Sequence, residues 1–122
     1  MSKAAWIKEN LKAGEKYAGI LPGKDGAPDQ HIILLPGQAN DVTFAEAEKW
    51  ALSVGGELPT RREQSLLFAN LKEEFEERYY WSCERHASDS DSAWFQNFGH
   101  GGQYDDDVDD TYRARAVRRL VI

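Results

Sequence analysis

The chain has 122 residues, of which 41% are hydrophobic and 30% are charged, and its formal net charge is −6. This size and balance are typical of one globular domain with its own core, and they exclude a disordered chain. The acidic charge argues against a nucleic-acid partner, and the sequence lacks the run of about 20 apolar residues that a membrane-spanning helix requires. We therefore expect a single domain over residues 1–122, without membrane insertion.

Residues 1–42 are expected to form an N-terminal arm followed by a β-hairpin. Two apolar runs, Tyr17–Leu21 and His31–Leu35, flank the connection PGKDGAP. Glycine and proline are typical of turns, so this pattern predicts two paired strands joined by a long loop. The N-terminal segment lacks the apolar stretch of a secretory signal, which favours a protein that is cytoplasmic as synthesised and leaves a virion location open.

A first helix is predicted over Thr43–Val54. Its apolar residues recur at close to helical spacing, and either Asp41 or Thr43 can cap its first turn. Gly55 and Gly56 follow directly, and a glycine in the left-handed conformation commonly ends a helix. Both ends of this helix are therefore marked in the sequence.

A second helix is expected from about Arg61 to about Glu74. Thr60 and Glu63 have the spacing of a capping box, in which each side chain bonds the free N–H group of the other residue. The buried stripe of this helix is predicted to consist of Leu66, Leu67, Asn70 and Leu71.

Three strands are predicted in the last third of the chain: Tyr79–Cys83, Ala93–Phe98 and Tyr112 to the C-terminus. In the third of them alanines alternate with arginines, which is the period of two that a β-strand shows. The arginines are expected to pair with Asp106–Asp110 and with acidic residues of the second helix. They are Arg113, Arg115, Arg118 and Arg119.

The order of these pieces resembles the C-terminal domain family of collagen-like bacterial adhesins, a domain of unknown function that is common in phages and prophages. The resemblance covers about Thr43 to Leu120, two thirds of the chain, and its pieces agree in order and spacing. In two places the chain departs from the family pattern, since Gly56 stands where members often have tryptophan and Ala116 where they often have cysteine. The matching residues are Gly55, Gly56, Leu58, Pro59, Thr60, Glu63, Tyr80, Trp81, Ser82, Ala93, Trp94, Phe98, Gly101, Arg115, Val117 and Arg118.

The resemblance implies an α+β domain with a C-type-lectin-like fold over residues 43–122. In that fold two helices pack on a small, mostly antiparallel sheet with a long loop region on one side. Because Ala116 replaces the cysteine, the disulfide of exported members is missing, which weakens the interpretation as a secreted adhesin. The lone Cys83 is expected to be a small buried residue, and Trp81 and Trp94 are expected to fill the core.

No catalytic constellation stands out, and we expect no enzymatic activity, no cofactor and no bound metal. His86 and His100 lie among many serines and aspartates, but a hydrolytic triad also needs a positioned nucleophile and an orienting acid. The acidic run YDDDVDD lacks the spacing of a calcium loop, because neighbouring side chains of an extended chain point to opposite sides. We expect a solvated acidic loop there, with a calcium-dependent lectin as an alternative.

The segment from Arg85 to Tyr112 has an unusual composition, because no Lys, Glu or Met occurs from Arg85 to the C-terminus. Its residues are those that an asparagine codon reaches when only its adenines change. Within the segment only Trp94, Gln96 and Gln103 fall outside that set. A diversity-generating retroelement is expected to produce such a segment, and the variable proteins of those systems use the same C-type-lectin-like fold.

We therefore predict a recognition surface at residues 85–110 for a protein or glycan ligand, such as a host cell-surface receptor. Binding residues are commonly carried by loops on a rigid scaffold. A second alternative is an intracellular protein that inhibits a host factor through its acidic surface, and the oligomeric state is left open. The candidate ligand-binding residues are Ser88, Asp89, Asp91, Ser92, Phe95, Asn97, His100, Gln103, Tyr104 and Asp105.

Overall fold

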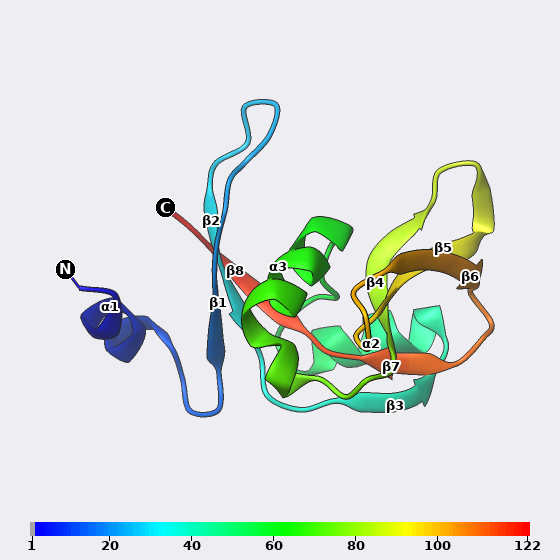
Figure 1. Cartoon of the computed structure of the whole chain (residues 1–122), viewed down its shortest axis with the longest axis horizontal. Coiled ribbons are helices and arrows are strands. Elements are labelled where there is room, and N and C mark those ends of the chain that lie inside the picture. The colour runs from blue at the N-terminus through cyan, green and yellow to red at the C-terminus, as the bar shows by residue number, and fades with distance from the viewer. Residues whose placement is uncertain (1) are drawn as a thin grey trace.

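A computed structural model describes residues 2–122, and these residues form an α+β fold of three α-helices and eight β-strands (Figure 1). The helices are α1 (Lys3–Asn10), α2 (Phe44–Ser53) and α3 (Arg61–Leu71), and a 3₁₀ turn, Lys72–Glu74, follows α3. The strands are β1 (Lys16–Leu21), β2 (Gln30–Leu34), β3 (Ala39–Val42), β4 (Tyr79–His86), β5 (Asp89–Asn97), β6 (Gln103–Asp107), β7 (Tyr112–Ala114) and β8 (Val117–Val121). The α+β class expected from the sequence is confirmed.

The strands form two sheets that share the helix α3. One sheet is antiparallel and has the order β1-β2-β8, and the other has the order β3-β7-β4-β5-β6. Pairing in the second sheet is antiparallel except between β4 and β7, where Tyr80 faces Arg113. This second sheet curls into a half-barrel; α2 contacts its strands β3, β7 and β4, while α3 contacts both β1 and β4–β5.

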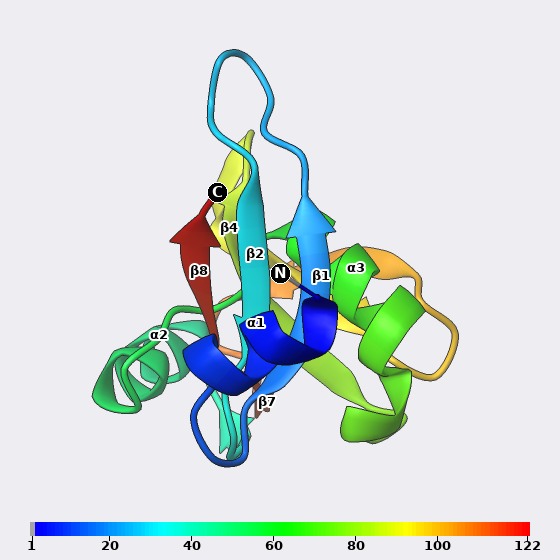
Figure 2. The same cartoon turned by 90° about the vertical axis from the view of Figure 1, so that its left-hand side faces the viewer.

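The predicted N-terminal hairpin is confirmed, and the arm before it forms a short helix that covers it. The loop between β1 and β2 projects beyond the three-stranded sheet, and α1 lies across one face of that sheet (Figure 2). Trp6 of α1 stacks on His31 with the ring centroids 4.0 Å apart, and the Tyr17 hydroxyl lies 2.7 Å from Nδ1 of His31. Aromatic contacts therefore hold the arm on the hairpin.

Both predicted helix starts are confirmed, and the two helices use the same device. The hydroxyl of Thr43 accepts the N–H of Glu46 at 3.3 Å, and the Glu46 carboxylate accepts the N–H of Thr43 at 2.9 Å. The corresponding distances between Thr60 and Glu63 are 3.1 and 2.8 Å. Gly55 ends α2 with φ of +85°, a conformation that favours glycine over residues with a side chain.

Buried side chains gather in two clusters. Inside the half-barrel the fully buried Trp81 meets Phe44 of α2 edge-on, with ring centroids 5.6 Å apart. The second cluster lies between α3 and the sheets and includes Leu67 and Phe98. Asn70, predicted for the buried stripe of α3, is instead exposed. The scaffold around residues 85–110 is thus anchored from both sides of the five-stranded sheet.

The polar segment differs most from the expectation of a long loop region. The chain continues β4 to His86, turns within two residues, and runs back as β5; β6 then pairs with β5 along its whole length. Aspartate is depleted in strands, yet Asp105 and Asp106 lie opposite Trp94 and Ala93 in regular register. Because β6 is an edge strand, its polar side chains reach water without loss of the backbone pairing.

Two side-chain assignments made from the sequence are also corrected. Trp81 is buried as expected, whereas Trp94 is only partly buried and has the Arg61 guanidinium 3.6 Å from its ring centroid. The expected pairing with acidic residues of the second helix is confirmed for Arg119 and Glu63, whereas within residues 2–122 no arginine pairs with Asp106–Asp110. Arg113 pairs with Glu76, Arg118 with Glu15, and Arg119 with Glu57 and Glu63, while buried Arg115 donates to the carbonyls of Glu74 and Leu35.

Candidate functional site

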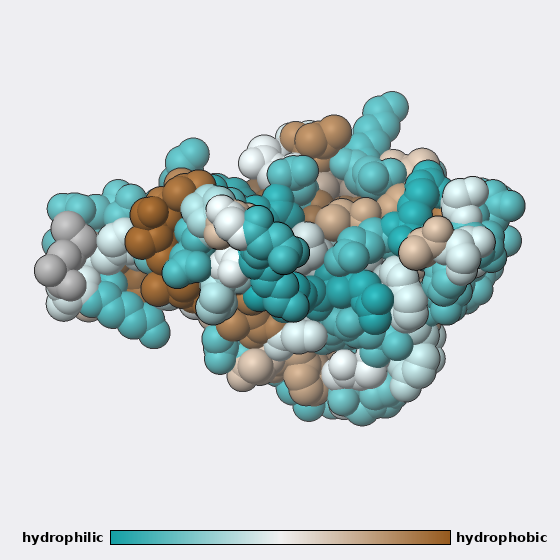
Figure 3. Space-filling view, turned by 90° about the horizontal axis from the view of Figure 1, so that it is seen from above, coloured by the Kyte–Doolittle hydropathy of each residue, from teal (hydrophilic) through white to brown (hydrophobic). Residues whose placement is uncertain are grey.

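The tip of the β4–β5 hairpin carries four of the predicted site residues. Ser88, Asp89 and Asp91 are exposed, and Ser92 is partly exposed. The Asp89 carboxylate fixes this tip, because one oxygen accepts the N–H of Asp91 at 3.0 Å and the other accepts the Ser92 hydroxyl at 3.2 Å. The tip is therefore an ordered polar surface, and the end of the molecule to which it belongs is mostly hydrophilic (Figure 3).

A second group lies at the turn between β5 and β6. Asn97 organises the turn by accepting the N–H of Gly99 at 2.7 Å, and Nδ1 of exposed His100 accepts the N–H of Gly102 at 3.1 Å. The Tyr104 ring stands nearly perpendicular to His100, with centroids 6.0 Å apart. These side chains thus form one surface, about the length of β5 away from the hairpin tip.

Phe95, which was predicted to contact ligand, belongs to the core instead. Phe95 is 6% exposed, and tyrosines on neighbouring strands surround its ring. The rings of Tyr79 and Tyr104 lie 4.9 Å and 6.0 Å from it between centroids, and these two residues are 42% and 49% exposed. We call Tyr79 and Tyr104 the tyrosine pair. Phe95 therefore supports an exposed aromatic surface without itself being open to a ligand.

The aspartates around β6 form an acidic surface. Asp105 and Asp107 are exposed, and neither forms an ion pair with any residue of the range 2–122. Asp106 points the other way, across the concave side of the half-barrel, and accepts a hydrogen bond from the Tyr112 hydroxyl. That bond holds the pKa of Asp106 below its ordinary value, while a hydrogen bond with Asp106 raises the pKa of Asp110.

Gln103, like Asp105 two residues later on β6, lies on the side of the sheet that faces α3. Its amide donates to the carbonyl of Arg61 at 2.7 Å and to the side-chain oxygen of Gln96 at 2.8 Å, and it accepts from Nε of Arg61 at 3.1 Å. Gln96 is fully buried and donates in turn to the carbonyl of Gln64 at 3.0 Å. The orientation of Arg61, and with it the stack on Trp94, is therefore set by Gln103, which the buried Gln96 holds in place.

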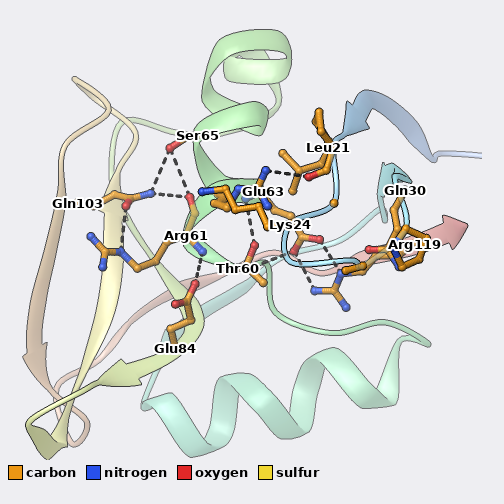
Figure 4. A pocket seen from close by; sticks show the side chains of 15 residues that line it. Leu21, Lys24, Gln30, Thr60, Arg61, Glu63, Ser65, Glu84, Gln103 and Arg119 are labelled. Atoms are coloured by element: carbon orange, nitrogen blue, oxygen red, sulfur yellow. Dashed lines mark hydrogen bonds and ion pairs between the residues drawn. The ribbon is translucent and has the colours of Figure 1, made fainter.

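Arg61 and Gln103 also line a pocket of about 650 Å³ between α3 and the β1–β2 loop (Figure 4). Lys24 enters it from the loop, and Arg62 donates to the carbonyl of Pro22 at 2.8 Å, which ties the loop to the helix. Sequence reasoning missed this pocket, because the loop and the helix are far apart in the chain and no motif links them. The pocket is also lined by Leu21, Pro28, Gln30, Glu63, Ser65, Glu84 and Arg119.

The potentially reactive side chains lie apart from one another. His86 stacks on Trp94 at 5.5 Å and its Nδ1 accepts the N–H of Ser88, whereas His100 sits at the opposite end of β5. Cys83, expected to be buried, is partly buried, and burial raises the pKa of its thiol to about 11. Among residues 2–122 no three His, Cys, Asp or Glu side chains are grouped to hold a metal ion, and no helix is both long and apolar enough to cross a membrane.

The comparisons with known proteins give no guidance beyond the geometry. No family model matches the sequence, and no curated protein matches it either. The functional interpretation therefore depends on the placement of the side chains described above.

Proposed function

We propose that this chain is a non-enzymatic binding module of phage or prophage origin, with a C-type-lectin-like arrangement and a recognition surface at residues 85–110. The proposal is supported by the regular strands in residues 85–110, because the composition of this segment is typical of a loop. Strands β4 to β6 fix the backbone, residues such as Ala93 and Phe95 are buried, and polar residues at the hairpin tip and along β6 reach solvent. A rigid frame lowers the entropy that a binding surface loses when it engages a ligand.

The ligand is a protein or a glycan, and the tyrosine pair and its polar neighbours suit either. Exposed tyrosines supply large contact areas at low entropic cost, and they often dominate the binding energy of an interface. His100 stands beside Tyr104 and can add hydrogen bonds that select among ligands. The aromatic contacts and the polar contacts would then come from one continuous surface.

A diversified origin is supported by the three residues that adenine changes in an asparagine codon cannot produce. Gln96 is fully buried, Gln103 bonds to Gln96 and Arg61, and Trp94 lies under the Arg61 guanidinium. All three belong to the internal network, whereas the adenine-reachable set includes exposed residues such as Ser88, Asp91 and Tyr104 as well as the buried Ala93 and Phe95. A variable surface on a fixed frame requires the unreachable residues to belong to the frame.

Deep sequencing of codons 85–112 from a growing lysogen or phage population tests the proposal. We expect substitutions at adenines, concentrated in the codons of exposed residues such as Ser88 and Tyr104, with the codons of Gln96 and Gln103 unchanged. A uniform segment would contradict diversification. Substitutions that fall on buried and exposed codons alike would contradict the assignment of the surface.

A second candidate function is that of an intracellular protein that inhibits a host factor. The unpaired carboxylates of Asp105 and Asp107, with Asp89 and Asp91 at the hairpin tip, favour a partner with basic groups. Binding of the labelled chain to intact host cells, compared with capture from a host lysate, separates the two candidates. Saturable binding to intact cells supports a surface receptor, whereas capture only from lysate, abolished by high salt, supports the intracellular role.

A further inference from the structure

The pocket between α3 and the β1–β2 loop is a second site on this protein. We infer that it binds a phosphorylated sugar, with the phosphate held by Lys24, Arg61 and Arg62. This inference is independent of the recognition surface at residues 85–110, because the pocket opens on the α3 side of the sheet and shares only Gln103 with the predicted site residues.

The charge of the pocket wall is the first argument. In a chain of net charge −6, this wall holds four basic side chains and two acidic ones, a net charge of +2. Arg119 and Glu63 neutralise each other through two hydrogen bonds of 2.6 and 2.8 Å. Lys24, Arg61 and Arg62 form no ion pair within residues 2–122, and Glu84 is the one carboxylate left to face them. Because a phosphate monoester carries about −1.5 to −2 charges at neutral pH, it matches this excess better than a single carboxylate does.

The first turn of α3 is not the source of this preference. The N–H of Glu63 is bonded to Thr60 at 3.1 Å, and the N–H of Arg61 is bonded to a carboxylate oxygen of Glu84 at 2.7 Å. These two amides are already occupied, so the side chains of the pocket are the main donors to a ligand. Charged donors form the stronger kind of hydrogen bond to phosphate oxygens, and Arg offers several donors in one plane.

Arg61 is held by the Trp94 ring and by Gln103, Arg62 donates to the carbonyl of Pro22, and the backbone that carries Lys24 is fixed by contacts of its own. Lys24 begins a tight turn in which Asp25 and Gly26 have φ of +54° and +84°, the combination of a type I′ turn, and the N–H of Ala27 closes the turn on the Lys24 carbonyl at 2.9 Å. The carboxylate of Asp29 accepts the N–H of Gly23 at 2.8 Å and fixes the base of the loop. Figure 4 shows Lys24 lying over the first turn of α3.

The rest of the wall suits a sugar ring. Leu21, Pro22 and Pro28 provide an apolar side, while the side chains of Gln30 and Ser65 offer groups that bond hydroxyls. A volume of about 650 Å³ is ample for one monosaccharide with its phosphate, because small-ligand pockets commonly measure about 300–1,000 Å³. A few polar groups above an apolar wall is the usual composition of such a pocket.

Isothermal titration calorimetry of the full chain at low salt tests the inference with three ligands: glucose 6-phosphate, inorganic phosphate and glucose. We expect glucose 6-phosphate to bind with a dissociation constant of about 1 mM or lower, inorganic phosphate to bind about tenfold more weakly, and glucose to give no heat. Equal affinities for glucose 6-phosphate and inorganic phosphate would contradict a sugar site, and absence of heat with either phosphate ligand would overturn the inference.

Two variants locate the binding. Lys24→Ala is expected to weaken glucose 6-phosphate about tenfold, because it removes one charged donor while the turn is closed by backbone bonds. Lys49→Ala, which removes the same charge from an exposed position of α2, is the matched control and should leave the affinity unchanged. Unchanged affinity in Lys24→Ala would place the ligand elsewhere, and an equal loss in both variants would show that only overall charge matters. Neither result bears on ligand binding at residues 85–110.

Discussion

The two capping boxes of this chain allow one buried ion pair to be measured against a matched reference. Glu63 and Glu46 each accept the N–H of a capping threonine, at 2.8 and 2.9 Å. Glu63 is 2% exposed and also receives Nε and Nη2 of Arg119, whereas Glu46 is exposed and has no basic partner within residues 2–122. Replacing each glutamate by alanine therefore removes one cap in both variants and the ion pair in only one.

We expect Glu63→Ala to lower the free energy of unfolding by about 3–4 kcal/mol. Loss of the cap contributes about 1 kcal/mol. Removing one partner of a buried pair costs about 3–5 kcal/mol, and the low end applies because the Arg119 side chain is 19% exposed and keeps Glu57 at 2.7 Å. For a domain of this size the total corresponds to a fall of roughly 12–16 °C in melting temperature.

Urea unfolding of Glu63→Ala, Glu46→Ala, Arg119→Ala and the double variant Glu63→Ala/Arg119→Ala gives the comparison. The double-mutant cycle should yield a coupling energy of about 2 kcal/mol between Glu63 and Arg119. A loss in Glu63→Ala no larger than that in Glu46→Ala would refute the reasoning. It would mean that desolvation of the pair offsets its attraction.

Three further results are expected. Phe95→Ala should lose about 3–4 kcal/mol of unfolding free energy and Tyr104→Ala under about 1 kcal/mol, measured by urea titration; equal losses would contradict their placement in core and surface. The hydrogen bonds of Arg118 hold the pKa of Glu15 below its ordinary 4.5, so the stability they contribute is present above that pH and is lost as the pH falls through the lower folded value. Glu15→Gln should therefore cost about 1–2 kcal/mol at pH 7 and flatten the acid limb of a pH–stability curve, whereas an unchanged limb would exclude this pair. With a pKa of about 11, Cys83 should react with iodoacetamide at pH 8 on the order of a hundredfold more slowly in the folded chain than in urea; equal rates would refute its shielding.

The elements that the sequence predicts are those with local signals. Thr60 and Glu63 define the start of α3 by their spacing, and Gly55 defines the end of α2 by its backbone conformation, as the structure confirms. The hairpin of β1 and β2 follows from two apolar runs around a loop rich in glycine and proline. Each of these signals lies within a few residues, so no knowledge of the tertiary arrangement is needed to interpret it.

No local sequence pattern predicts strand β6, because residues 105–107 are all aspartates, which are depleted in strands. Its conformation comes from backbone pairing with β5, which is a tertiary effect, and its position at the sheet edge keeps the carboxylates in water. Trp94 was assigned to the core on its size, but its side chain points to the α3 side of the sheet, where Arg61 covers it. In both cases the deciding neighbour is distant in the sequence.

The sequence predicted which segment carries an exposed polar surface, residues 85–110, but it did not predict correctly which side chains of that segment are exposed. Exposure of Ser88, Asp91 and Tyr104 agrees with a surface role, but strand alternation places Phe95 inside and turns Gln103 toward α3. Tyr79 precedes the segment of unusual composition and was therefore missed. The strand register decides which of these side chains are exposed and which are buried, and the register is known only from the fold.

The affinity of the chain for intact host cells, before and after removal of the side chains of Tyr104, His100 and Asp105, tests the recognition surface most directly. We predict saturable binding that the triple alanine variant weakens at least about a hundredfold, since surface anchors contribute on the order of 2 kcal/mol or more. A control variant that replaces exposed Glu9 and Glu73 by alanine should bind as the original chain does. Equal affinity of the triple variant and the original chain would contradict a recognition surface at residues 85–110.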